Sequence, residues 1–152
     1  MTERLITIER QIAAPRAEVW RVLADFPNIA DWNSGVKVSR ATSSATGGIG
    51  ASRHCDLAPA GGLDETIIDW QDEQRLVISI DKATVVPIDD AQITFILESS
   101  PSDDLTRTVV EYRYRPKGGP LRRFVGPLVD RQLAKGFAGF LVDLEKAAQR
   151  TD

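Results

Sequence analysis

The stretch IAAPRAEVWRVLADFPNIADWNSGV, residues 12–36, decides how the chain begins to fold. Pro15 stands where the first position of a helix tolerates a missing N–H, and Pro27 ends the apolar pattern that follows. The apolar residues between these prolines recur at helical spacing: Val19, Val22, Leu23 and Phe26. The spacing predicts a helix of about three turns over residues 15–25. Residues 28–32 are expected to form another brief helical segment.

Alternating patterns predict a β-sheet on both sides of this stretch. Residues 4–12 alternate apolar and polar side chains, which is typical of a strand with one buried face. After residue 36, short β-rich runs alternate with turn clusters, and these runs cover residues 36–42, 50–58, 63–70, 75–83, 91–99 and 106–115. In the last run Tyr112 and Tyr114 share one face, which we expect to point inward.

In the fifth strand, residues 75–83, either of the two alternating sets of side chains could face inward. The apolar pattern places Leu76, Ile78 and Ile80 inward. The opposite parity places Val77, Ser79 and Asp81 inward.

The C-terminal segment is predicted to be helical. Pro120 can open a first short piece, which Gly126-Pro127 is expected to interrupt. A long final helix is then predicted by apolar residues that step by three or four along one face: Leu133, Phe137, Phe140, Leu144 and Ala148. The whole order predicts an α+β fold, in which a curved antiparallel sheet of seven strands wraps this helix within one domain, residues 1–152.

Composition excludes several classes of function. The 152 residues include 19 basic and 22 acidic ones, so no excess of positive charge favours nucleic acid or an anionic membrane surface. One cysteine and one histidine are too few soft ligands for a structural zinc site, and we expect neither metal nor cofactor. Charged residues at positions 3, 4, 9 and 10 disfavour a signal peptide, which needs an unbroken apolar segment. No apolar run approaches the roughly 20 residues of a membrane-spanning helix. We expect a cytoplasmic monomer or homodimer that does not insert into membranes.

The opening stretch resembles the start of the START/Bet v 1-like superfamily, particularly its polyketide cyclase/dehydrase and lipid-transport group. The likeness rests on the Ala-Pro step, the Val-Trp pair in the first helix and the tryptophan that closes the second. The segment GLDETIIDWQDEQRL, residues 62–76, is similar to the family's glutamate-bearing fourth strand and its acidic turn. The resemblance implies a helix-grip fold with an elongated cavity for an apolar small molecule between the sheet and the final helix.

The resemblance also implies a polar end to this cavity. Comparison with the ligand-binding branch of the superfamily, notably the plant abscisic acid receptors, matches Glu65 to a cavity glutamate and Arg53 to an inward arginine. A buried carboxylate is costly unless paired, and a facing guanidinium supplies the pairing. The alternative is a solvated strand pair near the rim of the sheet. The residues expected to contact ligand are Trp32, Arg53, Cys55, Glu65, Ile67, Tyr112, Tyr114, Leu133, Gly136, Phe137 and Phe140.

Two other features favour ordinary structural roles. Neighbours on a strand project to opposite faces, so His54 and Cys55 cannot form a nucleophile–base pair; we expect a satisfied histidine and a small apolar wall residue. The glycine-rich TGGIGAS, residues 46–52, leads into a strand rather than a helix, so it predicts a turn and not a phosphate loop.

The first functional hypothesis is a small-molecule binding protein whose ligand is aromatic, polyketide-like or lipid-like. Its main rival is a cyclase or dehydratase in which Glu65 or a tyrosine acts as general acid or base, because such chemistry needs only a shaped cavity and one positioned proton donor. A third possibility is a module that binds a protein partner, although no conspicuous apolar surface segment points to one.

Overall fold

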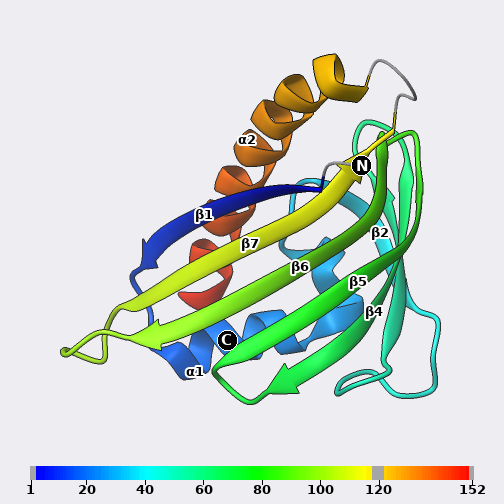
Figure 1. The fold of residues 1–152 in the computed structure, drawn as a ribbon. Helices are drawn as coiled ribbons and strands as arrows, with labels where there is room; N and C mark the ends of the chain where they lie inside the picture. The colour runs from blue at the N-terminus through cyan, green and yellow to red at the C-terminus, as the bar shows by residue number, and fades with distance from the viewer. Residues whose placement is uncertain (1–2, 118–121, 151–152) are drawn as a thin grey trace.

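The computed structural model describes residues 3–117 and 122–150. Two short helical elements separate the first strand from the other six, and a long helix follows the last (Figure 1). The elements are β1 (Arg4–Ile12), α1 (Arg16–Ala24), η1 (Phe26–Asp31), β2 (Val36–Ala41), β3 (Ser52–Leu57), β4 (Gly62–Gln71), β5 (Arg75–Thr84), β6 (Ile88–Ser99), β7 (Thr106–Pro116) and α2 (Arg122–Ala148).

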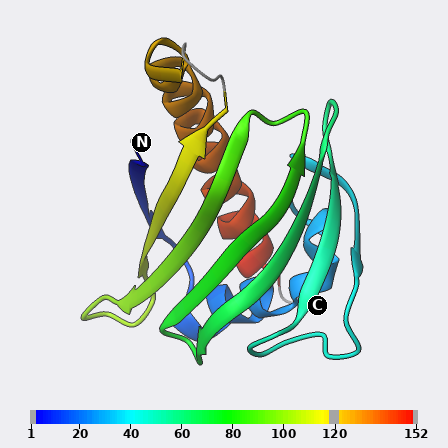
Figure 2. The same ribbon diagram turned by 45° about the vertical axis from the view of Figure 1, so that its right-hand side comes forward.

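The seven strands form one antiparallel sheet in the order β1-β7-β6-β5-β4-β3-β2. The sheet is strongly curved, and α2 crosses its concave side, with α1 closing one end (Figures 1 and 2). The predicted α+β helix-grip architecture is therefore confirmed.

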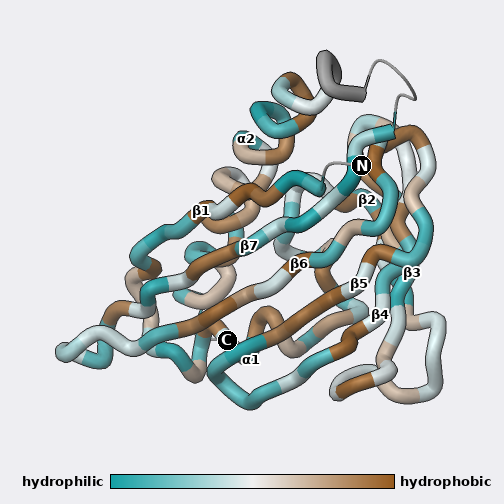
Figure 3. The backbone as a smooth tube through the Cα atoms, in the orientation of Figure 1, coloured by the Kyte–Doolittle hydropathy of each residue, from teal (hydrophilic) through white to brown (hydrophobic). Residues whose placement is uncertain are grey.

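The hydrophobic core lies between the concave face of the sheet and the helices. Leu76, Ile78 and Ile80 of β5 belong to this core, which decides between the two parities in favour of the apolar pattern. Tyr112 and Tyr114 of β7 are buried on the same side, as predicted. Hydrophobic residues accordingly line the middle of β5 and β6, while the turn between β4 and β5 is hydrophilic (Figure 3).

The predicted interruption at Gly126-Pro127 is wrong, because α2 runs without a break from Arg122 to Ala148. Pro127 lies in the second turn of the helix, where its missing N–H removes a single intrahelical hydrogen bond. Docking of α2 on the sheet outweighs this local cost, since Val129 is already buried two residues later. The expected helical piece at Pro120 lies outside the described residues.

Polar contacts attach both halves of α2 to the sheet. Asp130 accepts hydrogen bonds from Nε of Arg4, at 2.9 Å, and from the Tyr114 hydroxyl. Toward the other end, Glu145 accepts a 2.8 Å bond from the Ala13 amide and also pairs with Arg10. Among the residues that the structure describes, no helix combines the length and apolar character needed to cross a bilayer.

Candidate functional site

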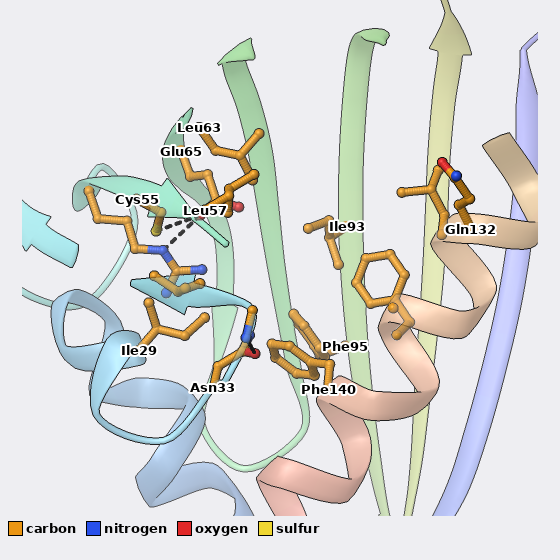
Figure 4. A pocket seen from close by; sticks show the side chains of 16 residues that line it. Ile29, Asn33, Cys55, Leu57, Leu63, Glu65, Ile93, Phe95, Gln132 and Phe140 are labelled. Carbon is orange, nitrogen blue, oxygen red and sulfur yellow. Dashed lines mark hydrogen bonds and ion pairs between the residues drawn. The ribbon is translucent and has the colours of Figure 1, made fainter. Parts of the chain in front are cut away.

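One largely apolar pocket, with a cavity volume of about 210 Å³, lies between α2 and the part of the sheet that contains β3 and β4 (Figure 4). Its helical wall consists of Gln132, Leu133, Gly136, Phe137 and Phe140. The rest is lined by η1, the η1–β2 loop and four strands, through Ile29, Asn33, Gly35, Val36, Arg53, Cys55, Leu57, Leu63, Glu65, Ile93 and Phe95.

The asymmetric position of α2 explains why space remains here. The helix backbone runs closest to β1 and β7, at one edge of the sheet, and to α1, which closes one end of the fold. Toward β3 and β4, the helix presents the half-buried residues Leu133, Phe137 and Phe140, which line the pocket. The rings of Phe95 and Phe140 stack with centroids 5.4 Å apart, and Figure 4 shows them across the pocket from Cys55 and Glu65. The pocket therefore has an aromatic side and a polar side.

The polar side is an ion pair between neighbouring strands. Arg53 of β3 and Glu65 of β4 are direct cross-strand partners, so their side chains project from the same face of the sheet. Nε of Arg53 donates to Oε1 of Glu65 at 2.8 Å, and the two side chains are only 7% and 3% exposed. This geometry matches the expectation that the Glu65 carboxylate is buried and paired. It does not match the alternative of a solvated pair at the rim of the sheet.

A second set of contacts holds the guanidinium in place. Nη1 of Arg53 donates to the Phe26 carbonyl oxygen at 2.8 Å, and the guanidinium carbon lies 3.8 Å from the centroid of the Phe26 ring. Stacking on an aromatic face stabilises a cation and leaves its in-plane N–H groups free to donate. Phe26, the first residue of η1, therefore orients the charged end of the pocket.

Cys55 lies beside this pair, with Sγ 3.5 Å from Oε1 of Glu65. Burial is the main cause that raises the pKa of the thiol to about 12, and the negative charge of Glu65 adds to it. The thiol is therefore protonated at neutral pH and is a wall residue rather than a nucleophile.

Seven of the eleven residues predicted to contact ligand lie together in the pocket wall: Arg53, Cys55, Glu65, Leu133, Gly136, Phe137 and Phe140. The structure places the other four outside it. Trp32 packs edge-on against Phe140, with ring centroids 5.0 Å apart. Ile67 is fully buried in the core shared with α1.

The two tyrosines are also outside the lining. The ring of Tyr112 packs against Phe137, with centroids 5.0 Å apart, and so supports the wall from behind. Tyr114 directs its hydroxyl to Asp130 and the Gly126 carbonyl. Burial is the first cause that raises the pKa of each tyrosine well above its ordinary value, so neither is prepared to lose a proton at neutral pH.

Nine lining residues were not predicted from the sequence: Ile29, Asn33, Gly35, Val36, Leu57, Leu63, Ile93, Phe95 and Gln132. Strand parity could have identified Ile93 and Phe95, because residues two positions apart in β6 face the same side of the sheet. Helical spacing could have identified Gln132, four residues before Gly136. Asn33 and Gly35 belong to a loop, where neither period applies.

Comparisons with known proteins agree with the fold. A family model described as polyketide cyclase/dehydrase and lipid transport matches residues 4–149. A START superfamily protein from Mycobacterium smegmatis has a TM-score of 0.79 at 13% identity, over 95% of this chain and 97% of that one. The Zhui aromatase/cyclase from a Streptomyces species also has a TM-score of 0.79 at 13% identity, over 98% of this chain and 95% of that one.

Norcoclaurine synthase from Thalictrum flavum has a TM-score of 0.74 at 15% identity, over 99% of this chain and 96% of that one. At such identities, these structures show a shared fold. A search of the curated proteins finds no match.

Proposed function

The chain belongs to the polyketide cyclase/dehydrase and lipid-transport family, and from this membership we propose that it binds a small hydrophobic molecule in the pocket between the sheet and α2. The observation that carries the proposal is a pocket with an aromatic wall on one side and a single buried ion pair on the other. Ligand sites are commonly apolar concavities with a few placed polar groups that fix orientation.

The glycine at the centre of the helical wall supports this proposal. Glycine in a helix interior costs roughly 1 kcal/mol relative to alanine, so its presence in α2 calls for a spatial reason. A Cβ built on Gly136 would meet no atom within 4 Å, and Gly136 lines the pocket. No part of the protein fills the space beside Gly136, so the absent side chain keeps this point of the pocket open.

Binding is favoured over the alternative of a cyclase or dehydratase, such as the name of the Streptomyces neighbour suggests. In that alternative, Glu65 or a tyrosine is the general acid or base. Oε1 of Glu65 is instead held by Arg53 and Cys55, which fixes the carboxylate and leaves only Oε2 to meet a ligand, while the Tyr114 hydroxyl is engaged by Asp130. These groups are placed to hold and orient, which supports a binding role.

Two leucine substitutions on α2 test the proposal. Gly136→Leu places a large side chain in the pocket, whereas Gly139→Leu makes the same change three residues away, where a Cβ also meets open space but the residue does not line the pocket. Both changes replace glycine in one helix, so both should gain similar intrinsic helix stability. Only Gly136→Leu should lose binding of uncharged aromatic probes.

The measurement is a thermal-shift screen of the three proteins. A probe at about 100 times its Kd stabilises the folded state by about 2.7 kcal/mol. For a chain of this size, the Tm should rise by roughly 5 to 11 °C. Wild type and Gly139→Leu should show this rise and Gly136→Leu should not. Equal shifts in all three proteins, or none in wild type, would contradict the proposal.

A further inference from the structure

The ion pair limits which small molecules can fill the pocket. We propose that the occupant is an uncharged compound with one ring or two fused rings and a hydroxyl group, and that the pocket rejects carboxylates. This inference rests on the proposed binding function and specifies its ligand class. It follows from the atoms that remain free at the polar side, from the charge balance there and from the pocket's size.

Two polar atoms of the pair remain free to meet a ligand. Oε1 of Glu65 is occupied by Arg53, and Nη1 of Arg53 by a backbone carbonyl. Within the described residues, Oε2 of Glu65 and Nη2 of Arg53 have no hydrogen-bond partner. Neither atom is among the fully buried polar atoms that lack a partner, which in the described residues belong to Arg16, Trp32 and Arg115. Oε2 and Nη2 are therefore reachable from the pocket that both side chains line.

These free atoms form one acceptor beside one donor. A hydroxyl group both donates and accepts, so a single ligand oxygen can donate to Oε2 and accept from Nη2. Hydrogen bonds that involve a charged partner are stronger than those between neutral groups. A ligand without a polar group would leave both atoms buried and unpartnered, which is costly.

A charged ligand would upset the existing balance. Arg53 and Glu65 are the charged residues of the lining, and they neutralise each other at 2.8 Å. A carboxylate would meet the attraction of Arg53 and the repulsion of Glu65 at similar distances, so little Coulomb energy would offset its loss of water. The same argument excludes an ammonium group with the signs exchanged. The polar side is therefore suited to a neutral group.

Size and wall chemistry restrict the rest of the ligand. The cavity volume of about 210 Å³ is below the roughly 300 to 1,000 Å³ that is usual for drug-sized ligands. Phe95, Phe137 and Phe140 present aromatic surface, and the rings of Phe95 and Phe140 already stack on each other. Offset stacking favours a flat ring over a flexible chain. A small fused ring therefore fits better than a sterol or a long acyl chain.

Three probes of matched shape test the inference: 2-naphthol, naphthalene and 2-naphthoate. Their affinities for wild type are measured by calorimetry at about pH 7.5, where a phenol keeps its proton and a carboxyl group is ionised. We expect 2-naphthol to bind at least about tenfold more tightly than naphthalene, since a hydrogen bond to a charged group is worth about that factor. We expect 2-naphthoate to bind more weakly than naphthalene.

Glu65→Gln should reverse the order of the two polar probes. The change removes the repelling charge but keeps the shape, so an unpaired Arg53 remains to attract a carboxylate. 2-Naphthoate should then bind more tightly than 2-naphthol. Glu98→Gln is the matched control, because Glu98 is exposed and pairs with Arg107 away from the pocket. This variant should keep the wild-type order.

A second measurement uses only the wild-type protein, so it tests the inference even if Glu65→Gln fails to fold. The affinity of wild type for 2-naphthoic acid should rise as the pH falls through the pKa of the free acid, because only the neutral form fits. A pH-independent affinity for the acid, or wild-type affinities for 2-naphthoate that equal those for 2-naphthol, would overturn the inference while leaving the binding function intact. No binding of any of the three probes would overturn both.

Discussion

At the scale of single residues, His54 and Arg53 are adjacent in sequence but belong to opposite faces of β3. Arg53 faces the pocket, whereas His54 faces outward and lies between two carboxylates. Its Nδ1 is 2.6 Å from Oδ1 of Asp64, and its Nε2 is 3.0 Å from Oδ1 of Asp56. The hydrogen bond to Asp64, followed by that to Asp56, raises the pKa of His54 above its ordinary value. When protonated, the ring links Asp64 of β4 with Asp56 of β3, on the face of the sheet opposite to the ion pair of the pocket.

This pKa shift predicts a pH-dependent stability. Because the folded-state pKa is raised, the stabilisation is fully present below the unfolded value of about 6.5 and is lost as the pH rises through the folded value. The Tm difference between wild type and His54→Gln should therefore shrink between about pH 6 and pH 9. Thermal melts of both proteins across this range measure it. A difference that stays constant with pH would show that folding does not raise the pKa of His54.

At the scale of elements, α2 depends on Asp130 for the attachment of its N-terminal half. Nε of Arg4 donates to Asp130 at 2.9 Å, and the buried Tyr114 hydroxyl also donates to it. Asp130→Ala should lower the free energy of unfolding by about 1 to 3 kcal/mol, because it removes hydrogen bonds to a charged group and leaves a buried hydroxyl with a weaker partner. Urea denaturation measures the change. Lys135→Ala, at an exposed position of the same helix, is the control. Equal stability of the two variants would contradict this role for Asp130.

The strands and helices also show which parts of the structure can be predicted from the sequence. Alternation with period two located the strands, and period 3.6 located the apolar face of α2, because both periods follow directly from which side a residue faces. The rule that a Gly-Pro pair breaks a helix failed at Gly126-Pro127, since it considers local backbone cost and not the burial gained by docking. The Arg53–Glu65 pair was expected only from family resemblance: the residues are twelve positions apart, and strand periodicity alone does not fix their register. Asn33 and Gly35 remained unseen because a loop has no period.

At the scale of the whole molecule, the pocket results from a mismatch between a strongly curved sheet and a straight helix. The helix packs closely along β1 and β7. Between the helix and β3 and β4 the backbones are farther apart, and side chains line the space that remains. The C-terminal part of its apolar face, including Leu141 and Leu144, is fully buried. Phe137 and Phe140, which precede it, are only partly buried because they border the open space. Along this one helix, the apolar face thus changes from part of the buried core to part of the pocket wall.

The most direct test of the account is to locate a bound ligand by NMR. In wild type with labelled Ile, Leu and Val methyl groups, addition of 2-naphthol should shift the resonances of Ile29, Leu57, Leu63, Ile93 and Leu133, which line the pocket. The exposed methyl groups of Leu5, Val38 and Ile68 serve as internal controls and should not move. Shifts confined to these exposed residues, or no shift at saturating 2-naphthol, would contradict the claim that the space between the sheet and α2 is the binding site.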